Sequence, residues 1–124
     1  MHQATIIQRL ARATFWAALL FAFVMATLPH PPQVMGTMWD KAQHMIAFAV
    51  LTALACIAFA TTRTRTILLW LAGFGALIEF VQAIPALHRD SDIHDWAADL
   101  IAISLVLLLR LAIKRFVLPA GRRA

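Results

Sequence analysis

The chain has 124 residues, of which 62% are hydrophobic and only 14% are charged, and its formal net charge is +5. Soluble domains carry about 25% charged residues. The composition therefore excludes a soluble globular protein and predicts one membrane-embedded domain over residues 1–124. Nucleic-acid binding is also excluded, because the basic residues flank apolar stretches and form no patch interleaved with aromatic residues. The lone Cys56 allows no intrachain disulfide.

Four stretches of the chain are suited to cross a membrane. A helix that spans a bilayer needs about 20 mostly apolar residues, and residues 10–28, 42–60, 66–85 and 93–113 meet that requirement. Pro31 and Pro32 separate the first stretch from the second, because proline cannot continue a helix. We therefore predict an all-α fold, an integral membrane bundle of four transmembrane helices.

Basic residues are distributed unevenly between the two ends of this predicted bundle. Nine lie at the end that holds both termini and the 61–65 connection, whereas only Lys41 and Arg89 lie at the other end. Positive residues concentrate on the cytoplasmic side of a membrane. This bias predicts cytoplasmic termini and a multi-pass protein of the bacterial inner membrane. Trp39 and Trp96 then fall at the outer membrane face, where indole rings are common.

The first stretch has an alternative interpretation as a cleaved signal peptide. Residues 1–26 have a basic start, an apolar segment and the small-residue motif Val24-Met25-Ala26, which could serve as a cleavage site. The apolar segment is long for a signal peptide, which favours a retained transmembrane helix. The prediction therefore keeps all four helices.

A polar stripe lies on the third predicted helix, near its outer end. Gly75, Glu79 and Gln82 follow helical spacing and share one face, and Gly75 with Ala72 would allow a neighbouring helix to approach closely. Glu79 lies about 9 Å below Pro85 at 1.5 Å per residue. An ionisable group at this depth normally faces the bundle interior. We predict that Glu79 lies inside the bundle, either in a functional site or in a structural hydrogen bond to a neighbouring polar side chain.

The second and fourth predicted helices begin with polar groups at a similar depth. Two more stripes follow helical spacing, Lys41, His44 and Phe48 on one helix and Asp92, Asp95 and Asp99 on the other. The cluster contains good helix N-cap residues, so capping is an alternative role for Asp40 and for either Ser91 or Asp92.

These stripes predict a binding site at the outer membrane face. Lys41 and Arg89, together with the positive ends of two helices, favour an anionic ligand. The acidic and imidazole groups beside them could move protons, and whether any reaction is catalysed is left open. The candidate proton-handling residues are Glu79, His44 and Asp95, and the candidate ligand-binding residues are Asp40, Lys41, Gln82, Arg89 and Asp99.

The sequence suggests three alternatives to this ligand site. The string His88-x-Asp90-x-Asp92-x-His94 contains metal-ligand residue types, but its spacing fits no single helix face, so no metal or other cofactor is expected. A small proton-coupled transporter is disfavoured, because small exporters of dual topology have a weak charge bias. A scaffold protein, in which the polar cluster only stabilises the bundle, is the third alternative.

The same residues resemble the VanZ-like family of small bacterial membrane proteins. Three motif pieces between about residues 38 and 105 carry the resemblance: Asp40, Lys41, His44 and Phe48; Gly75, Glu79 and Gln82; and Pro85, Arg89 and Asp95. The chain departs from the family pattern at Asp99, where the family usually has asparagine, and at Ala102, where it usually has glycine. An ionised aspartate only accepts hydrogen bonds, so the proton arrangement around Glu79 need not follow that of the family.

The resemblance implies a function at the cell envelope. The family is named for a membrane protein associated with low-level resistance to the glycopeptide teicoplanin. It supplies no established reaction. Membrane lipids or a lipid-linked envelope precursor are the partners that we expect, and self-association is left open.

Overall fold

A computed structural model of the protein describes residues 5–29, 40–89 and 91–117. The elements are α1 (Ile6–Thr27), α2 (Asp40–Ala58), α3 (Thr64–Gln82), the short 3-10 helix η1 (Pro85–Leu87) and α4 (Ile93–Phe116). All four α-helices are long and apolar enough to cross a membrane. The predicted all-α bundle of four membrane-spanning helices is therefore confirmed.

Several helix ends differ from their predicted positions, and two of the differences have clear local causes. Helix α1 begins at Ile6 because Thr5 and Gln8 form a capping box, in which each side chain accepts a hydrogen bond from the backbone N–H of the other at 3.1 Å. Helix α3 ends at Gln82 instead of continuing to Pro85. The residue before a proline avoids the helical conformation, and Ile84 is extended, with φ −68° and ψ 118°.

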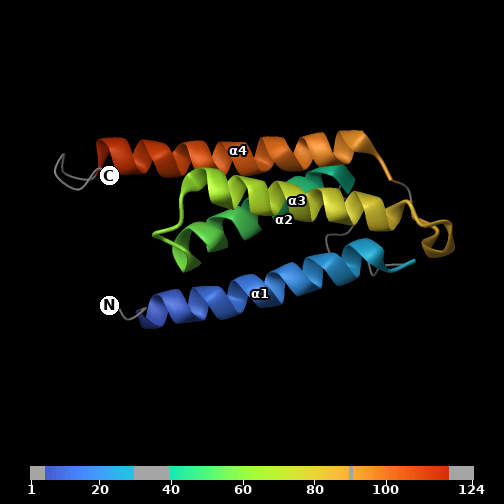
Figure 1. Cartoon of the computed structure of the whole chain (residues 1–124), viewed down its shortest axis with the longest axis horizontal. Coiled ribbons are helices and arrows are strands. Elements are labelled where there is room, and N and C mark those ends of the chain that lie inside the picture. Colours follow the sequence, from blue (N-terminus) through green and yellow to red (C-terminus); the bar gives the residue numbers. More distant parts are fainter. Residues whose placement is uncertain (1–4, 30–39, 90, 118–124) are drawn as a thin grey trace.

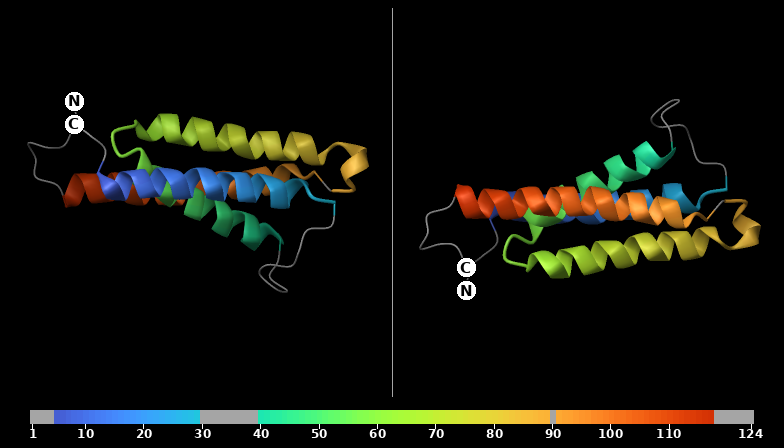
Figure 2. Two further views of the ribbon diagram at one scale, coloured as in Figure 1. Left: turned by 90° about the horizontal axis from the view of Figure 1, so that it is seen from below. Right: turned by 90° about the horizontal axis from the view of Figure 1, so that it is seen from above.

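The helices run up and down, so that α1 begins and α4 ends at the same end of the bundle (Figure 1). Helix α4 packs mainly against α2 and α3, and α1 packs mainly against α2. Helices α2 and α3 meet at their short connection and diverge toward the opposite end (Figure 2).

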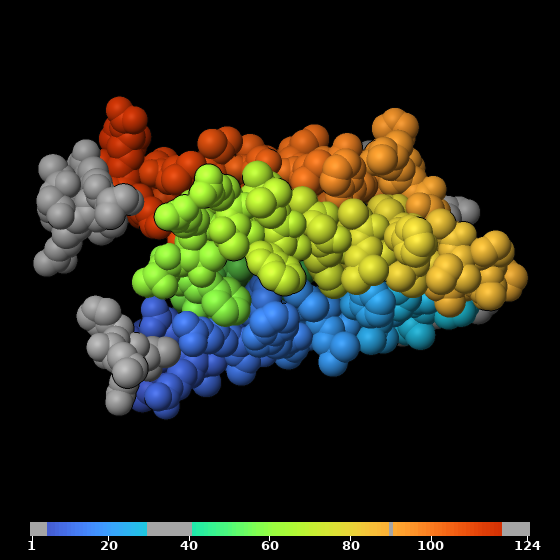
Figure 3. Space-filling model, in the orientation of Figure 1, coloured from blue at the N-terminus to red at the C-terminus, as the bar shows by residue number. Residues whose placement is uncertain are grey.

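The bundle has a narrow interior and an apolar exterior. Phe48, Leu51, Ile78 and Ile103 are fully buried, whereas Trp70 and Phe80 are 77% and 76% exposed. Figure 3 shows the face on which α3 lies between α1 and α4. Many other large apolar side chains are also exposed, which is unfavourable in water but well solvated by lipid chains. The exterior therefore fits a multi-pass membrane protein.

Candidate functional site

Buried polar residues gather at the end of the bundle where α3 ends and where α2 and α4 begin. Glu79, Gln82 and Asp99 are only 9%, 2% and 0% exposed. Gly75, Glu79 and Gln82 are all buried on one face of α3, as their spacing predicted. The expected position of Glu79 inside the bundle is therefore confirmed.

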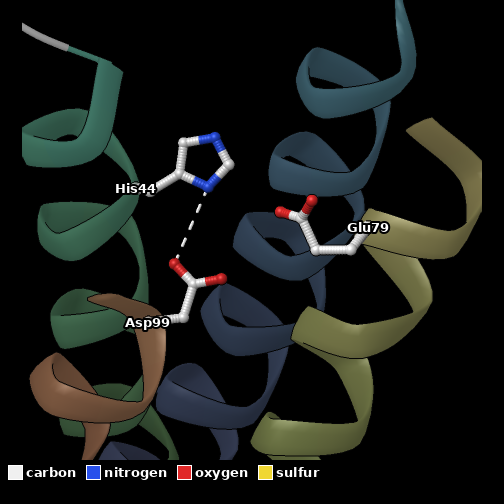
Figure 4. Close-up of side chains that lie close together, drawn as sticks. All are labelled: His44, Glu79 and Asp99. Atoms are coloured by element: carbon white, nitrogen blue, oxygen red, sulfur yellow. Dashed lines mark ion pairs between the residues drawn. The ribbon is translucent and has the colours of Figure 1, made fainter. Parts of the chain in front are cut away.

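The centre of this polar end is a cluster of His44, Glu79 and Asp99, which come from three different helices. Figure 4 shows the three side chains turned toward one another. One nitrogen or oxygen atom from each residue lies within 4.8 Å of the others. Nδ1 of His44 is 3.7 Å from Oδ1 of Asp99, which is an ion-pair distance and too long for a hydrogen bond.

Glu79 is held by the segment that leads into α4. Its Oε2 accepts a hydrogen bond of 2.9 Å from the backbone N–H of Asp92, and the Ser91 hydroxyl lies 3.2 Å from the same oxygen. The Ser91 hydroxyl also lies 2.9 Å from the Glu79 carbonyl oxygen. The structure thus assigns Glu79 hydrogen-bond partners in the segment that precedes α4. The sequence indicated Ser91 only as a helix cap.

Lys41 lies at the more exposed side of the cluster and joins α2 to α4. Its Nζ is 3.2 Å from Oδ1 of Asp95 and 3.4 Å from Oδ2 of Asp92, and the lysine side chain is 28% exposed. These two carboxylates balance the lysine charge and fix its position. The sequence placed these three residues at one membrane face but did not indicate that they form a single ion-pair network.

Asp92 is the N-cap of α4, as one of the two capping alternatives predicted. Its Oδ1 accepts a hydrogen bond of 2.9 Å from the backbone N–H of His94 and lies 2.9 Å from Nδ1 of the same histidine. The backbone N–H and the ring of His94, with a smaller contribution from Lys41, lower the pKa of Asp92 to about 2. Asp92 is therefore ionised at neutral pH.

Two side chains of the predicted site fasten the end of α1 to the rest of the bundle. Gln82 donates a hydrogen bond of 2.8 Å from Nε2 to the carbonyl oxygen of Ala26, and Arg89 donates one of 3.1 Å from Nη1 to that of Leu28. The side chain of Asp40 lies outside the described part of the structure, so its predicted capping or ligand-binding role stays a prediction.

Trp96 and Gly75 set the distance between α3 and α4 beside the cluster. The indole N–H of Trp96 donates a hydrogen bond of 3.0 Å to the carbonyl oxygen of Ala72. A Cβ atom built on Gly75 would lie 3.2 Å from Cδ1 of Trp96 and 3.3 Å from Oδ2 of Asp99. The expected close approach of a helix at Gly75 is confirmed. Trp96, which the sequence indicated as a residue of the membrane interface, also connects two helices.

The fold and the site together define a multi-pass membrane protein with an acid-rich polar cluster inside one end of its helix bundle. No protein-family model, no curated protein and no solved structure matches the chain. The resemblance to the VanZ-like family accordingly stays a prediction from the three sequence motifs.

Proposed function

We propose that the chain is a VanZ-like protein of the bacterial cytoplasmic membrane, which binds the anionic head group of a lipid or lipid-linked envelope precursor at the outer face. The supporting observation is the convergence of polar side chains from α2, α3 and α4 at one end of an apolar bundle. A 19-residue helix such as α3 is about 28 Å long, close to the thickness of the hydrocarbon core. Such a length would place this polar end near the lipid head groups.

Arg89 is the residue that we assign to the anion. Its hydrogen bond to Leu28 uses one of the five N–H donors of a guanidinium group, so the same side chain can also hold a phosphate. Lys41 adds a second positive charge, which Asp92 and Asp95 keep near the cluster. If the bound head group also reacts, Glu79, His44 and Asp95 are the general acid and base candidates.

The ligand proposal predicts that Arg89→Ala weakens binding of a polyprenyl phosphate by about tenfold or more, because a charge-assisted hydrogen bond contributes about 1.5–3 kcal/mol. Binding is measured with a fluorescent polyprenyl phosphate, and separately with phosphatidylglycerol, on protein in nanodiscs of neutral phosphatidylcholine. By the family resemblance, the same variant should change sensitivity to teicoplanin in a strain that depends on this protein.

Arg65→Ala is the matched control, because it removes the same charge as Arg89→Ala. Arg65 is exposed and lies at the start of α3, at the end of the bundle opposite Arg89. It should bind both anionic lipids as the unmodified protein does. Equal binding by the protein and its Arg89→Ala variant would overturn the ligand proposal. That outcome, with Glu79→Gln also leaving the envelope phenotype unchanged, would favour the scaffold alternative.

The proposed orientation predicts that the polar end faces away from the cytoplasm. Ala86 in η1 and Thr61 in the connection between α2 and α3 are both exposed and lie at opposite ends of the bundle. In a Cys56→Ser background, Ala86→Cys should react with a membrane-impermeant maleimide in intact spheroplasts. Thr61→Cys should react only after lysis. The reverse pattern would place the polar end in the cytoplasm and contradict the orientation.

A further inference from the structure

We propose that His44, Glu79 and Asp99 together bind one divalent transition-metal cation inside the polar end of the bundle. The site goes beyond the proposed lipid binding, because it needs neither Arg89 nor Lys41. The three residues come from α2, α3 and α4, and Figure 4 shows that their side chains converge. Each offers a ligand atom, and these atoms lie within 4.8 Å of one another.

Buried carboxylate oxygen atoms in the cluster lack hydrogen-bond partners among the described residues, and a metal cation could take the place of the missing donors. Within the described parts of the chain, neither carboxylate oxygen of Asp99 has a hydrogen-bond partner, although the residue is 0% exposed. Oε1 of Glu79 is likewise buried without a partner in those segments, while Oε2 is held by the backbone of Asp92. Buried carboxylate oxygens are normally hydrogen-bonded or bound to metal.

The charges of the cluster also favour a cation. Glu79 and Asp99 place two carboxylates within 4.8 Å of each other, which is unfavourable in a low-dielectric interior unless protons or a cation balance them. The nearby Lys41 forms ion pairs with two other carboxylates, those of Asp92 and Asp95. A divalent cation would neutralise both carboxylates at once and would use the imidazole of His44 as a third ligand.

The ligand set selects the class of metal. Mg²⁺ and Ca²⁺ prefer oxygen ligands alone, whereas one imidazole nitrogen with two carboxylate oxygens suits Zn²⁺, Mn²⁺ or Fe²⁺. A point equidistant from three atoms 4.8 Å apart lies about 2.8 Å from each, and Zn²⁺ ligands lie about 2.0–2.2 Å away. Side-chain movements of less than about 1 Å would therefore close the site. Three protein ligands would leave a position open for water or for a ligand oxygen.

The site differs from the metal-ligand string considered in the sequence. Two members of that string, Asp92 and His94, bind each other at the surface, and the His94 side chain is 78% exposed. Asp90 lies outside the described residues. His94→Ala therefore provides a control with the same residue change as His44→Ala, but outside the buried cluster.

The test uses full-length protein in detergent, stripped with a chelator and titrated with ZnCl₂ alone. We expect about one Zn²⁺ per chain by elemental analysis after gel filtration. His44→Ala and Asp99→Asn should each raise the apparent Kd for Zn²⁺ by more than about tenfold, while His94→Ala should leave it unchanged. Co²⁺ added in place of Zn²⁺ should give visible absorption bands that disappear in His44→Ala. Circular dichroism checks that each variant stays helical.

Absence of stoichiometric Zn²⁺ binding by the unmodified protein would overturn the metal site, whatever the variants do. Loss of zinc in His94→Ala but not in His44→Ala would move the metal to the surface string and would also overturn it. The titration contains no added lipid, and Arg89→Ala keeps all three proposed ligands. Failure of the metal site and failure of the lipid site are therefore separate results.

Discussion

Gly75→Leu is expected to lower the free energy of unfolding by about 1–3 kcal/mol, the usual effect of adding volume to a packed interior. Even a single Cβ at this position would lie 3.2 Å from Trp96 Cδ1, 3.3 Å from Asp99 Oδ2 and 3.4 Å from Phe48 Cζ. A leucine side chain would push α3 away from α4 and displace Asp99 from the cluster. We therefore expect weaker Zn²⁺ binding as well as lower stability.

Gly73→Leu is the matched control for this substitution. Gly73 lies on the same helix two residues earlier, and a Cβ built there meets nothing within 4 Å. Both variants make the same residue change in α3, so a general effect of leucine on the helix cancels. Unfolding is measured by far-ultraviolet circular dichroism during titration with sodium dodecyl sulfate. Equal losses of stability in the two variants would show that the close contacts at Gly75 do not determine the free energy of unfolding.

The four helices could be predicted from the sequence because apolar length alone demands them. A run of about 20 apolar residues has few folded alternatives to a membrane-spanning helix. The exact ends were harder to predict, since they depend on local hydrogen bonds and backbone geometry. The Thr5–Gln8 capping box makes α1 begin at Ile6, earlier than predicted. Helix α3 ends at Gln82, and Ile84, just before Pro85, already has an extended backbone.

The interior position of the polar residues could also be predicted, but their partners could not. Helical spacing placed Glu79 on a shared face with Gly75 and Gln82, and the unfavourable energy of a lipid-facing carboxylate oriented that face inward. Which groups meet depends on how far each helix slides and rotates against its neighbours. One residue of sliding moves a side chain by about 1.5 Å, enough to make or break a contact. The grouping of His44 with Asp99 therefore required the structure.

A bound divalent cation would change what Arg89 can bind. Among the side chains described at the polar end, four carboxylates (Glu79, Asp92, Asp95 and Asp99) accompany one lysine and one arginine (Lys41 and Arg89). An anionic head group would add to this negative excess and would be repelled by it. A cation held by His44, Glu79 and Asp99 would remove the excess. We therefore expect Zn²⁺ to strengthen binding of a polyprenyl phosphate.

The opposite end of the bundle depends on a different polar residue, Arg110. Replacing Arg110 with methionine is expected to lower the free energy of unfolding by about 2–4 kcal/mol, because hydrogen bonds to charged groups are strong and unpaired carbonyl groups are unfavourable in a membrane. Arg110 is only 8% exposed. Its Nη2 donates hydrogen bonds of 2.9 Å and 3.0 Å to the carbonyl oxygens of Ala60 and Thr62, just beyond the end of α2.

The control for Arg110→Met is Arg115→Met, which removes the same charge from an exposed residue of the same helix. The guanidinium of Arg115 lies 5.8 Å from the ring centroid of Phe116, and we expect its replacement to change stability by no more than about 0.5 kcal/mol. Detergent unfolding followed by circular dichroism measures both. Because both variants lose one positive charge from the end of α4, a difference between them reports on the carbonyl contacts of Arg110. Equal stability of the two variants would show that the carbonyl contacts of Arg110 do not stabilise the bundle. Arg110 would then contribute only to the orientation of the protein in the membrane, as the charge bias predicts.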